Sequence, residues 1–198
     1  MSQTAAVMRV LEEAGAYLEG HFLLSSGRHA ERYLQMALPF QDPAVGAFLG
    51  RALAERVREA GLAAEWVVGP ALGAIIPGYE LARALTWRFA FAERDADGRM
   101  ALRRGFQLAA GQRVLLCENV VTTGGSAREV IALLRGLGAQ VVGVAAYGDR
   151  TGSDAAFDVP FVPLVRLDFA TWDPAECPLC RRGEPIQAPG SRHLLAGG

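Results

Sequence analysis

The chain has 198 residues, of which 51% are hydrophobic and 21% are charged, and its formal net charge at pH 7 is −1. This balance suits one globular domain with a sizeable core and excludes a disordered chain. The near-zero net charge also excludes a strongly basic nucleic-acid binder. No apolar run approaches the ~18 residues of a membrane span, which excludes a membrane protein.

The N-terminal sequence MSQTAAVMRVLEEAG has neither a basic start nor an uninterrupted apolar stretch, so a signal peptide is not expected. Three cysteines are too few for a disulfide framework in a chain of this length. We therefore expect a cytoplasmic protein with reduced thiols and with no nucleic-acid or membrane partner.

The first 60 residues predict two helices separated by two short strands. The first helix is predicted from apolar residues at helical spacing, which are Val7, Val10, Leu11, Ala14 and Leu18. Gly20 can end this helix. Strands are expected at 21–25 and 33–36, with the turn sequence SSGR between them. Asp42 followed by Pro43 predicts a capped helix that runs to about Ala60 and ends at Gly61.

From residue 66 onward, short apolar runs alternate with helical segments. The expected strands are 66–68, 88–92, 113–117, 140–147 and 161–167, and the expected helices are the second half of 69–85 and 125–137. This alternation predicts an α/β fold with a mostly parallel central sheet flanked by helices. We expect a single domain over 1–198, with an N-terminal hood region at 1–40, the α/β core at 41–168 and a C-terminal tail at 169–198.

The sequence CENVVTTGGS at 117–126 joins an expected strand to an expected helix, which is where parallel α/β sheets bind ligands. The first N–H groups of a helix lack internal partners, the glycines allow close approach, and Thr122, Thr123 and Ser126 add hydroxyl donors. Together they predict a phosphate cradle. The alternative is a capped helix after a glycine turn. No lysine follows the glycines and the loop is not GxGxxG, which argues against ATP P-loops and dinucleotide folds.

Glu118 and Asn119 precede this cradle, where an acid would oppose an anionic ligand. A ligand that carries hydroxyls beside its phosphate would explain both residues. A carboxylate accepts hydrogen bonds from hydroxyls, and an amide both donates and accepts hydrogen bonds. The stretch therefore predicts a ribose phosphate ligand.

This stretch resembles the signature loop of the type I phosphoribosyltransferases, with Asn119 where the family usually has aspartate. The resemblance implies that the loop binds 5-phosphoribosyl 1-diphosphate (PRPP) through Glu118, Asn119, Val120, Val121, Thr122, Thr123, Gly124, Gly125 and Ser126. It also implies Mg²⁺ as cofactor, held mainly by substrate oxygens and not by protein side chains.

Four further segments, in the right order, resemble the orotate phosphoribosyltransferases of that family. They are HFLLSSGRHAERY at 21–33, VVGPALGAIIPGYELARAL at 67–85, FAERDADGRMALRRGF at 91–106, which resembles the mobile loop, and YGDRTGS at 147–153. The resemblance implies transfer of the ribosyl phosphate of PRPP to orotate, in a homodimer whose subunits share active sites. A purine phosphoribosyltransferase, a PRPP-binding regulator of the same fold and a purely structural α/β domain are the alternatives.

The resemblance also assigns site residues. Arg150 and Thr122 are expected to bind orotate, with Arg150 pairing its carboxylate. The alternative for Arg150 is a surface arginine paired with Asp149 or Asp154. Arg94 is expected at the pyrophosphate, and Arg103 and Arg104 are expected to assist it, so that Glu118 and these arginines form the catalytic set. A solvated loop of mixed charge, with Asp95 and Asp97, is the alternative for the loop.

Cys177 and Cys180 form C-x-x-C, which is half of a zinc site, and a dimer could combine two halves. A reduced pair in a turn is the preferred interpretation. His21, His29 and His193 show no metal-binding spacing, so each is expected to be a surface histidine or one with satisfied hydrogen bonds.

Overall fold

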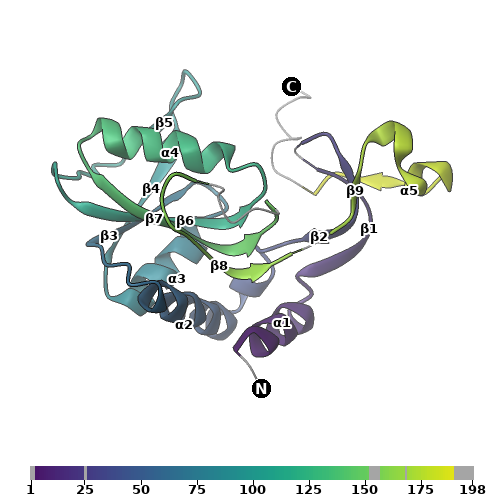
Figure 1. Cartoon of the computed structure of the whole chain (residues 1–198), viewed down its shortest axis with the longest axis horizontal. Coiled ribbons are helices and arrows are strands. Elements are labelled where there is room, and N and C mark those ends of the chain that lie inside the picture. The colour runs from purple at the N-terminus through teal and green to yellow at the C-terminus, as the bar shows by residue number, and fades with distance from the viewer. Residues whose placement is uncertain (1–2, 25, 152–156, 168, 190–198) are drawn as a thin grey trace.

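A computed structural model describes residues 3–24, 26–151, 157–167 and 169–189, which form two sheets (Figure 1). The larger sheet has six strands in the order β5-β4-β3-β6-β7-β8, and all neighbours are parallel except the antiparallel pair β4–β5. Its strands are β3 (Trp66–Pro70), β4 (Arg88–Arg94), β5 (Met100–Leu102), β6 (Arg113–Val121), β7 (Gln140–Asp149) and β8 (Phe161–Arg166).

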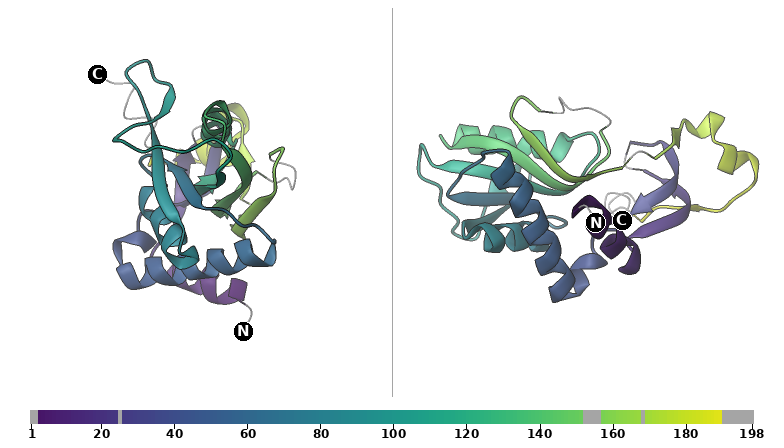
Figure 2. Two further views of the ribbon diagram at one scale, coloured as in Figure 1. Left: turned by 90° about the vertical axis from the view of Figure 1, so that its left-hand side faces the viewer. Right: turned by 60° about the horizontal axis from the view of Figure 1, so that its bottom comes forward.

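Helices cover both faces of this sheet. The helices α2 (Pro43–Glu59) and α3 (Ile75–Leu85) lie on one face and α4 (Gly125–Gly136) lies on the other (Figures 1 and 2). Val67, Val68 and Leu115 are accordingly fully buried, as expected for strands covered on both sides. The predicted mostly parallel sheet flanked by helices is confirmed. Among the described residues, no helix has both the length and the apolar character needed to cross a membrane.

The second helix begins and ends where the sequence predicts. Oδ1 of Asp42 accepts a hydrogen bond of 2.8 Å from the backbone N–H of Ala44, and Pro43 occupies the first turn. The helix ends at Glu59, and Gly61 follows with a φ of +69°, a conformation that glycine adopts without strain.

A second sheet of four strands forms a hood beside the core, in the order β10-β1-β2-β9. It pairs the N-terminal strands β1 (Tyr17–Leu23) and β2 (His29–Leu34) with the C-terminal strands β9 (Thr171–Trp172) and β10 (Ile186–Gln187). The remaining elements are α1 (Gln3–Glu13), α5 (Pro178–Arg181) and the 3₁₀ turns η1 (Pro39–Gln41) and η2 (Pro174–Glu176). Both ends of the chain therefore build the hood (Figure 1).

Several predicted boundaries were wrong. The first helix stops at Glu13, because Gly15 turns the chain with a φ of +66°, and Leu18 and Gly20 belong to β1. The strand expected at 33–36 is β2 and ends at Leu34. The loop expected at 93–105 contains β5, which pairs antiparallel with β4.

The strand expected at 113–117 is also longer than predicted, because β6 continues to Val121. Glu118 and Asn119 are therefore strand residues, and the connection to α4 is correspondingly short. Their backbone pairing with β7 continues past them, since Glu118 stands opposite Ala146 and Val121 opposite Asp149.

Gly50 lets the helices α2 and α3 approach closely. A Cβ at this position would lie 2.7 Å from the backbone oxygen of Glu80, so Gly50→Ala is expected to lower the free energy of unfolding by about 1–3 kcal/mol. Gly136→Ala, at the end of α4, is the control, because a Cβ there meets nothing within 4 Å. Urea unfolding of both variants measures the difference, and equal stabilities would contradict the close approach.

Candidate active site

A pocket of about 400 Å³ lies where the hood faces the carboxyl ends of β6 and β7, a size typical of small-molecule sites. The core contributes residues 118–126 and Arg150 to its wall. The hood contributes Leu23, Leu24, Ser26, Arg28, Tyr33, Leu34 and Thr171, and Gln35 and Met36 complete the lining. The structure thus brings Glu118, Asn119, the TTGGS turn and Arg150 together around one cavity.

The turn between β6 and α4 is contacted by a side chain of α4 and by the ring of Phe157. Gly124 precedes α4 with a φ of +72°, and a Cβ there would lie 3.0 Å from the ring of Phe157. Nη1 of Arg128 donates a hydrogen bond of 2.6 Å to the carbonyl oxygen of Thr123. The residue before α4 is a glycine, so it has no side chain that could cap the helix. The turn lines the pocket, and the N-terminus of α4 therefore faces the pocket, as an anion site requires.

The pair that precedes the turn combines a buried acid with an amide. Glu118 is only 7% exposed and lines the pocket. Oδ1 of Asn119 accepts a hydrogen bond of 2.7 Å from the backbone N–H of Val120. A Cβ added to Gly73 would lie 2.7 Å from Nδ2 of Asn119, so this amide lies directly against the loop between β3 and α3.

Arg150 follows β7 and is anchored to the neighbouring strand. Its backbone N–H donates to the carbonyl oxygen of Val121 at 2.8 Å, and its guanidinium carbon lies 5.5 Å from the centre of the Phe169 ring. Burial lowers the pKa of Arg150, and the hydroxyl of nearby Tyr33 acts in the opposite direction. A partly buried cation therefore faces the cavity beside aromatic rings.

The alternative partners predicted for Arg150 are Asp149 and Asp154. Asp149 is 3% exposed, and its Oδ1 accepts from the N–H and the hydroxyl of Thr151, both at 2.8 Å. Its Oδ2 lies 4.0 Å from Nε of Arg166. Asp149 thus has Thr151 and Arg166 as described partners, and Asp154 lies outside the described residues.

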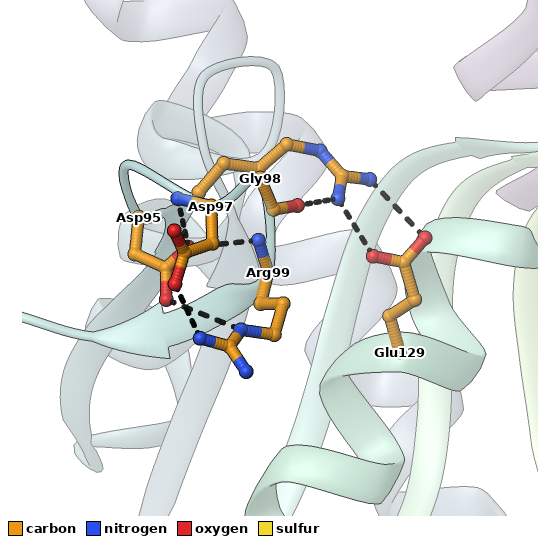
Figure 3. Close-up of polar contacts among 6 residues, drawn as sticks. Asp95, Asp97, Gly98, Arg99 and Glu129 are labelled. Atoms are coloured by element: carbon orange, nitrogen blue, oxygen red, sulfur yellow. Dashed lines mark hydrogen bonds and ion pairs between the residues drawn. The ribbon is translucent and has the colours of Figure 1, made fainter.

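The three loop arginines do not line the pocket. Arg94 donates to the carbonyl oxygen of Gly98 and to both carboxylate oxygens of Glu129 on α4, at 2.8 and 3.1 Å. Figure 3 shows the Gly98 carbonyl oxygen and the Glu129 carboxylate directed toward the same guanidinium group. Arg104 contacts both carboxylate oxygens of Glu93 at 3.0 Å, and Nε of Arg103 lies 3.9 Å from the same carboxylate. In this conformation, all three guanidinium groups pair with carboxylates of the protein.

The sequence did not single out Arg28, Tyr33 and Thr171 as site residues. Arg28 donates to the hydroxyl of Thr171 at 3.1 Å and to its carbonyl oxygen at 2.7 Å, which joins the SSGR turn to β9. Burial raises the pKa of Tyr33, and the charge of Arg150 opposes the shift. The segment 21–33, which resembles the family, contains both Arg28 and Tyr33, but neither was assigned a role in the site, and no sequence pattern marked Thr171.

His21 and His29 are histidines with hydrogen-bond partners, which is one of the two predicted interpretations, because Nδ1 of His21 lies 2.8 Å from the carbonyl oxygen of Glu184 and Nε2 of His21 lies 2.8 Å from Nδ1 of His29. His21 and His29 are only 2% and 6% exposed, and their ring nitrogens lie next to Cys177 and Cys180, so the four residues form a group with metal-ligand chemistry. The grouping depends on the pairing of the two chain ends in the hood, which residue spacing cannot reveal. His193 lies outside the described residues.

The fold and the pocket together define a phosphoribosyltransferase. A profile of the phosphoribosyl transferase domain matches residues 40–158, and the chain belongs to this family. It is 48% identical, over 188 residues, to the orotate phosphoribosyltransferase of Thermotoga maritima, and the match covers 95% of this chain and 99% of the relative. The predicted family and fold class are therefore confirmed.

Solved structures agree with this assignment. The crystal structure of orotate phosphoribosyltransferase from Aeropyrum pernix matches with a TM-score of 0.71 and 26% identity, over 81% of this chain and 93% of that one. The adenine phosphoribosyltransferase of Saccharomyces cerevisiae matches with a TM-score of 0.65 and 19% identity, over 81% and 99%. The second match shows the fold alone, so the shape of the backbone does not select the nucleobase.

Proposed function

We propose that this chain is a cytoplasmic orotate phosphoribosyltransferase, which converts orotate and PRPP to orotidine 5′-monophosphate and diphosphate in pyrimidine (UMP) biosynthesis. The observation that carries the proposal is a single pocket in which the TTGGS turn, Glu118 and Arg150 face one cavity. The near full-length similarity to orotate phosphoribosyltransferases supports the choice of nucleobase.

Each part of the pocket matches one part of the ligands. The N–H groups and hydroxyls of 122–126 bind the 5-phosphate. Glu118 and Asn119 accept hydrogen bonds from the ribose hydroxyls. The backbone of Val120 and Val121 holds this strand end in place. Arg150 pairs with the carboxylate of orotate, and the hydroxyl of Thr122 contacts the base.

The reaction breaks the bond between ribose C1 and the diphosphate oxygen and forms a bond from C1 to a ring nitrogen of orotate. This nitrogen loses its proton, which the released diphosphate or water accepts. Positive charge develops on the ribose as the leaving group departs, so a buried carboxylate at Glu118 stabilises the transition state more than the substrate. The rest of the rate acceleration comes from holding the two substrates next to each other in one cavity.

Magnesium fits this pocket as an ion held mainly by substrate. Of the described residues that line the cavity, Glu118 alone is acidic, and one carboxylate falls far short of the six oxygens that Mg²⁺ prefers. The oxygens of PRPP and water would supply the others, and the bound ion would neutralise charge on the diphosphate.

The loop arginines are proposed to act after a movement of the loop 93–105, which contains all three. Arg94, Arg103 and Arg104 would exchange their glutamate partners for diphosphate oxygens, which carry more charge than a carboxylate. Breaking these ion pairs costs little free energy, because ion pairs at the protein surface stabilise a fold by only about 0–1 kcal/mol each.

The function is tested by incubating the purified protein with Mg²⁺, PRPP and orotate and following orotate consumption by absorbance. Parallel reactions contain adenine, guanine or uracil in place of orotate. Orotate should be consumed and the other bases should not. Turnover of a purine alone would assign a purine phosphoribosyltransferase, and tight salt-sensitive DNA binding without turnover would assign a regulator.

Asn119→Asp is expected to keep kcat/KM within about threefold of the parent enzyme. The oxygen that accepts from the N–H of Val120 is retained by aspartate, and an acid is equally able to accept ribose hydroxyls. Steady-state kinetics with varied PRPP measure the effect, and Asn119→Leu, which removes the acceptor, should raise KM for PRPP. Inactivation of Asn119→Asp would show that the amide N–H donates an essential bond.

We also propose a homodimer with shared active sites, because an apolar patch is exposed beside the loop between β3 and α3. Leu72 is 83% exposed, Ile76 is 55% exposed and Tyr79 is 53% exposed, and Ile76 and Tyr79 lie one helical turn apart on α3. Ile76→Asp is expected to give a monomer in light scattering. Leu137→Asp, at an exposed apolar residue after α4, is the control and should leave the dimer intact.

A further inference from the structure

The hood contains a compact group of four side chains that the proposed reaction does not use: His21 on β1, His29 on β2, and Cys177 and Cys180 around α5. One ligand-type atom from each lies within 4.8 Å of all the others. Three of the four residues are buried, and Cys180 is exposed, which leaves a path for an ion to enter. All three cysteines of the chain have free thiols in this structure.

The distances within the group are close to those of a tetrahedral zinc site. With Zn–S bonds of about 2.3 Å and Zn–N bonds of about 2.0–2.1 Å, sulfur and nitrogen ligands lie about 3.5–3.6 Å apart. The Sγ atoms of Cys177 and Cys180 lie 3.6 and 3.7 Å from Nε2 of His21, and Sγ of Cys180 lies 3.3 Å from Nδ1 of His29. These separations need almost no adjustment to admit the ion.

The two imidazole nitrogens lie closer together than two zinc ligands do. Nε2 of His21 and Nδ1 of His29 are 2.8 Å apart, a hydrogen-bond distance, whereas two nitrogen ligands of one zinc ion lie about 3.3 Å apart. A shift of about half an ångström, together with movement of the His29 proton to its other ring nitrogen, would turn both lone pairs toward the ion.

A backbone contact already sets the ring of His21 for this role. Nδ1 of His21 lies 2.8 Å from the carbonyl oxygen of Glu184, so Nδ1 carries the proton and Nε2 presents its lone pair to the cysteines. Histidines that bind metals commonly donate their second ring nitrogen to a carbonyl or a carboxylate, which fixes the tautomer. The contact comes from the segment after α5, the same part of the chain that supplies the cysteines.

We propose that His21, His29, Cys177 and Cys180 bind one structural Zn²⁺ ion that fastens the C-terminal segment to the N-terminal hairpin of the hood. Two thiolates and two neutral imidazoles suit zinc, and four protein ligands leave no open position for catalysis. Binding releases the two thiol protons, so the charge of the ion is balanced within the site.

The ion would stabilise the wall of the pocket without touching it. Arg28, which lines the pocket, directly precedes His29, and its guanidinium bonds Thr171 on β9. The strands β9 and β10 are only two residues long, so their few backbone hydrogen bonds alone hold the tail weakly. A zinc ion would supply the cross-link that these short strands lack.

The test is the metal content of the full chain, produced without a polyhistidine tag from zinc-supplemented culture and measured by elemental analysis. About one zinc ion per chain is expected, and Cys180→Ser and His29→Ala should each fall below about 0.2. Cys117→Ala is the matched control, because Cys117 is a buried thiol of β6 outside the group, and it should retain the ion.

A second measurement keeps the proposal falsifiable if the variants fail to fold. Wild-type protein stripped with a chelator and loaded with Co²⁺ should show thiolate-to-cobalt charge-transfer bands and the visible absorption of tetrahedral cobalt, and it should regain the melting temperature lost on stripping. Wild-type protein with less than about 0.1 zinc ion per chain and no such bands would overturn the proposal, as would a Cys177–Cys180 disulfide in the purified protein.

Discussion

Replacing Arg150 by alanine is expected to weaken orotate binding by about 2 kcal/mol or more, roughly 30-fold in Kd, while PRPP affinity changes little. Arg150 is partly buried at the carboxyl end of β7, and its backbone is pinned to Val121. A carboxylate that loses a bidentate partner in such a position keeps its desolvation cost without compensation. Calorimetric titration with each substrate separately measures both affinities.

Two further variants sharpen this prediction. Arg150→Lys keeps the charge but loses the planar pair of donors, so it should restore only part of the orotate affinity. Arg166→Ala removes an exposed arginine near Asp149 and should leave orotate affinity unchanged. Equal losses of orotate and PRPP affinity in Arg150→Ala would contradict the assignment of Arg150 to the base.

Glu118→Gln is expected to lower kcat/KM by about 100-fold with little change in stability. The substitution keeps the shape of a side chain that is 7% exposed, but it removes the negative charge that faces the developing ribose cation. Steady-state kinetics with both substrates varied, together with thermal melting, separate the catalytic effect from a folding effect.

Glu65→Gln provides the control for charge removal. Glu65 lies just before β3, at the opposite end of that strand from the pocket, and accepts from the backbone N–H of Arg113 through an oxygen that glutamine retains. Its kcat/KM should remain near that of the parent enzyme. An unchanged kcat/KM in Glu118→Gln would remove Glu118 from the catalytic set.

The core of the fold was predictable because its strands are continuous apolar runs and its helices have clear end signals. The runs at 66–68 and 113–117 became β3 and β6, and Asp42 capped α2 as expected. The end of β6 was misplaced because its last residues border a pocket, where polar side chains such as Glu118 occur within a strand. Apolar patterning marks burial against the core and cannot locate a strand end that faces a ligand.

The hood was harder to predict, since its strands are short and come from both ends of the chain. Two-residue strands such as β9 and β10 carry no periodic signal, so the tail at 169–198 gave no indication that it pairs with β1 and β2. For the same reason, His21 and His29 were not connected to the distant cysteines. Local spacing revealed only the C-x-x-C half of the group.

The candidate site shows a similar division. The residues that lie on one connection, 118–126, were found together, because a strand, a glycine turn and a helix start are readable in sequence. Arg94 and Arg104 were identified as loop cations, but their guanidinium groups pair with Glu129 and Glu93 in this conformation. Side-chain partners of an exposed arginine depend on the position of the loop, which the sequence does not specify.

A crystal structure with orotidine 5′-monophosphate tests the central claim most directly, because this one ligand contains the phosphate, the ribose and the base. The phosphate should lie within the turn 122–126, the ribose hydroxyls beside Glu118, and the carboxylate within about 3 Å of the Arg150 guanidinium. A ligand bound with its phosphate elsewhere, or with its carboxylate directed away from Arg150, would contradict the proposed site.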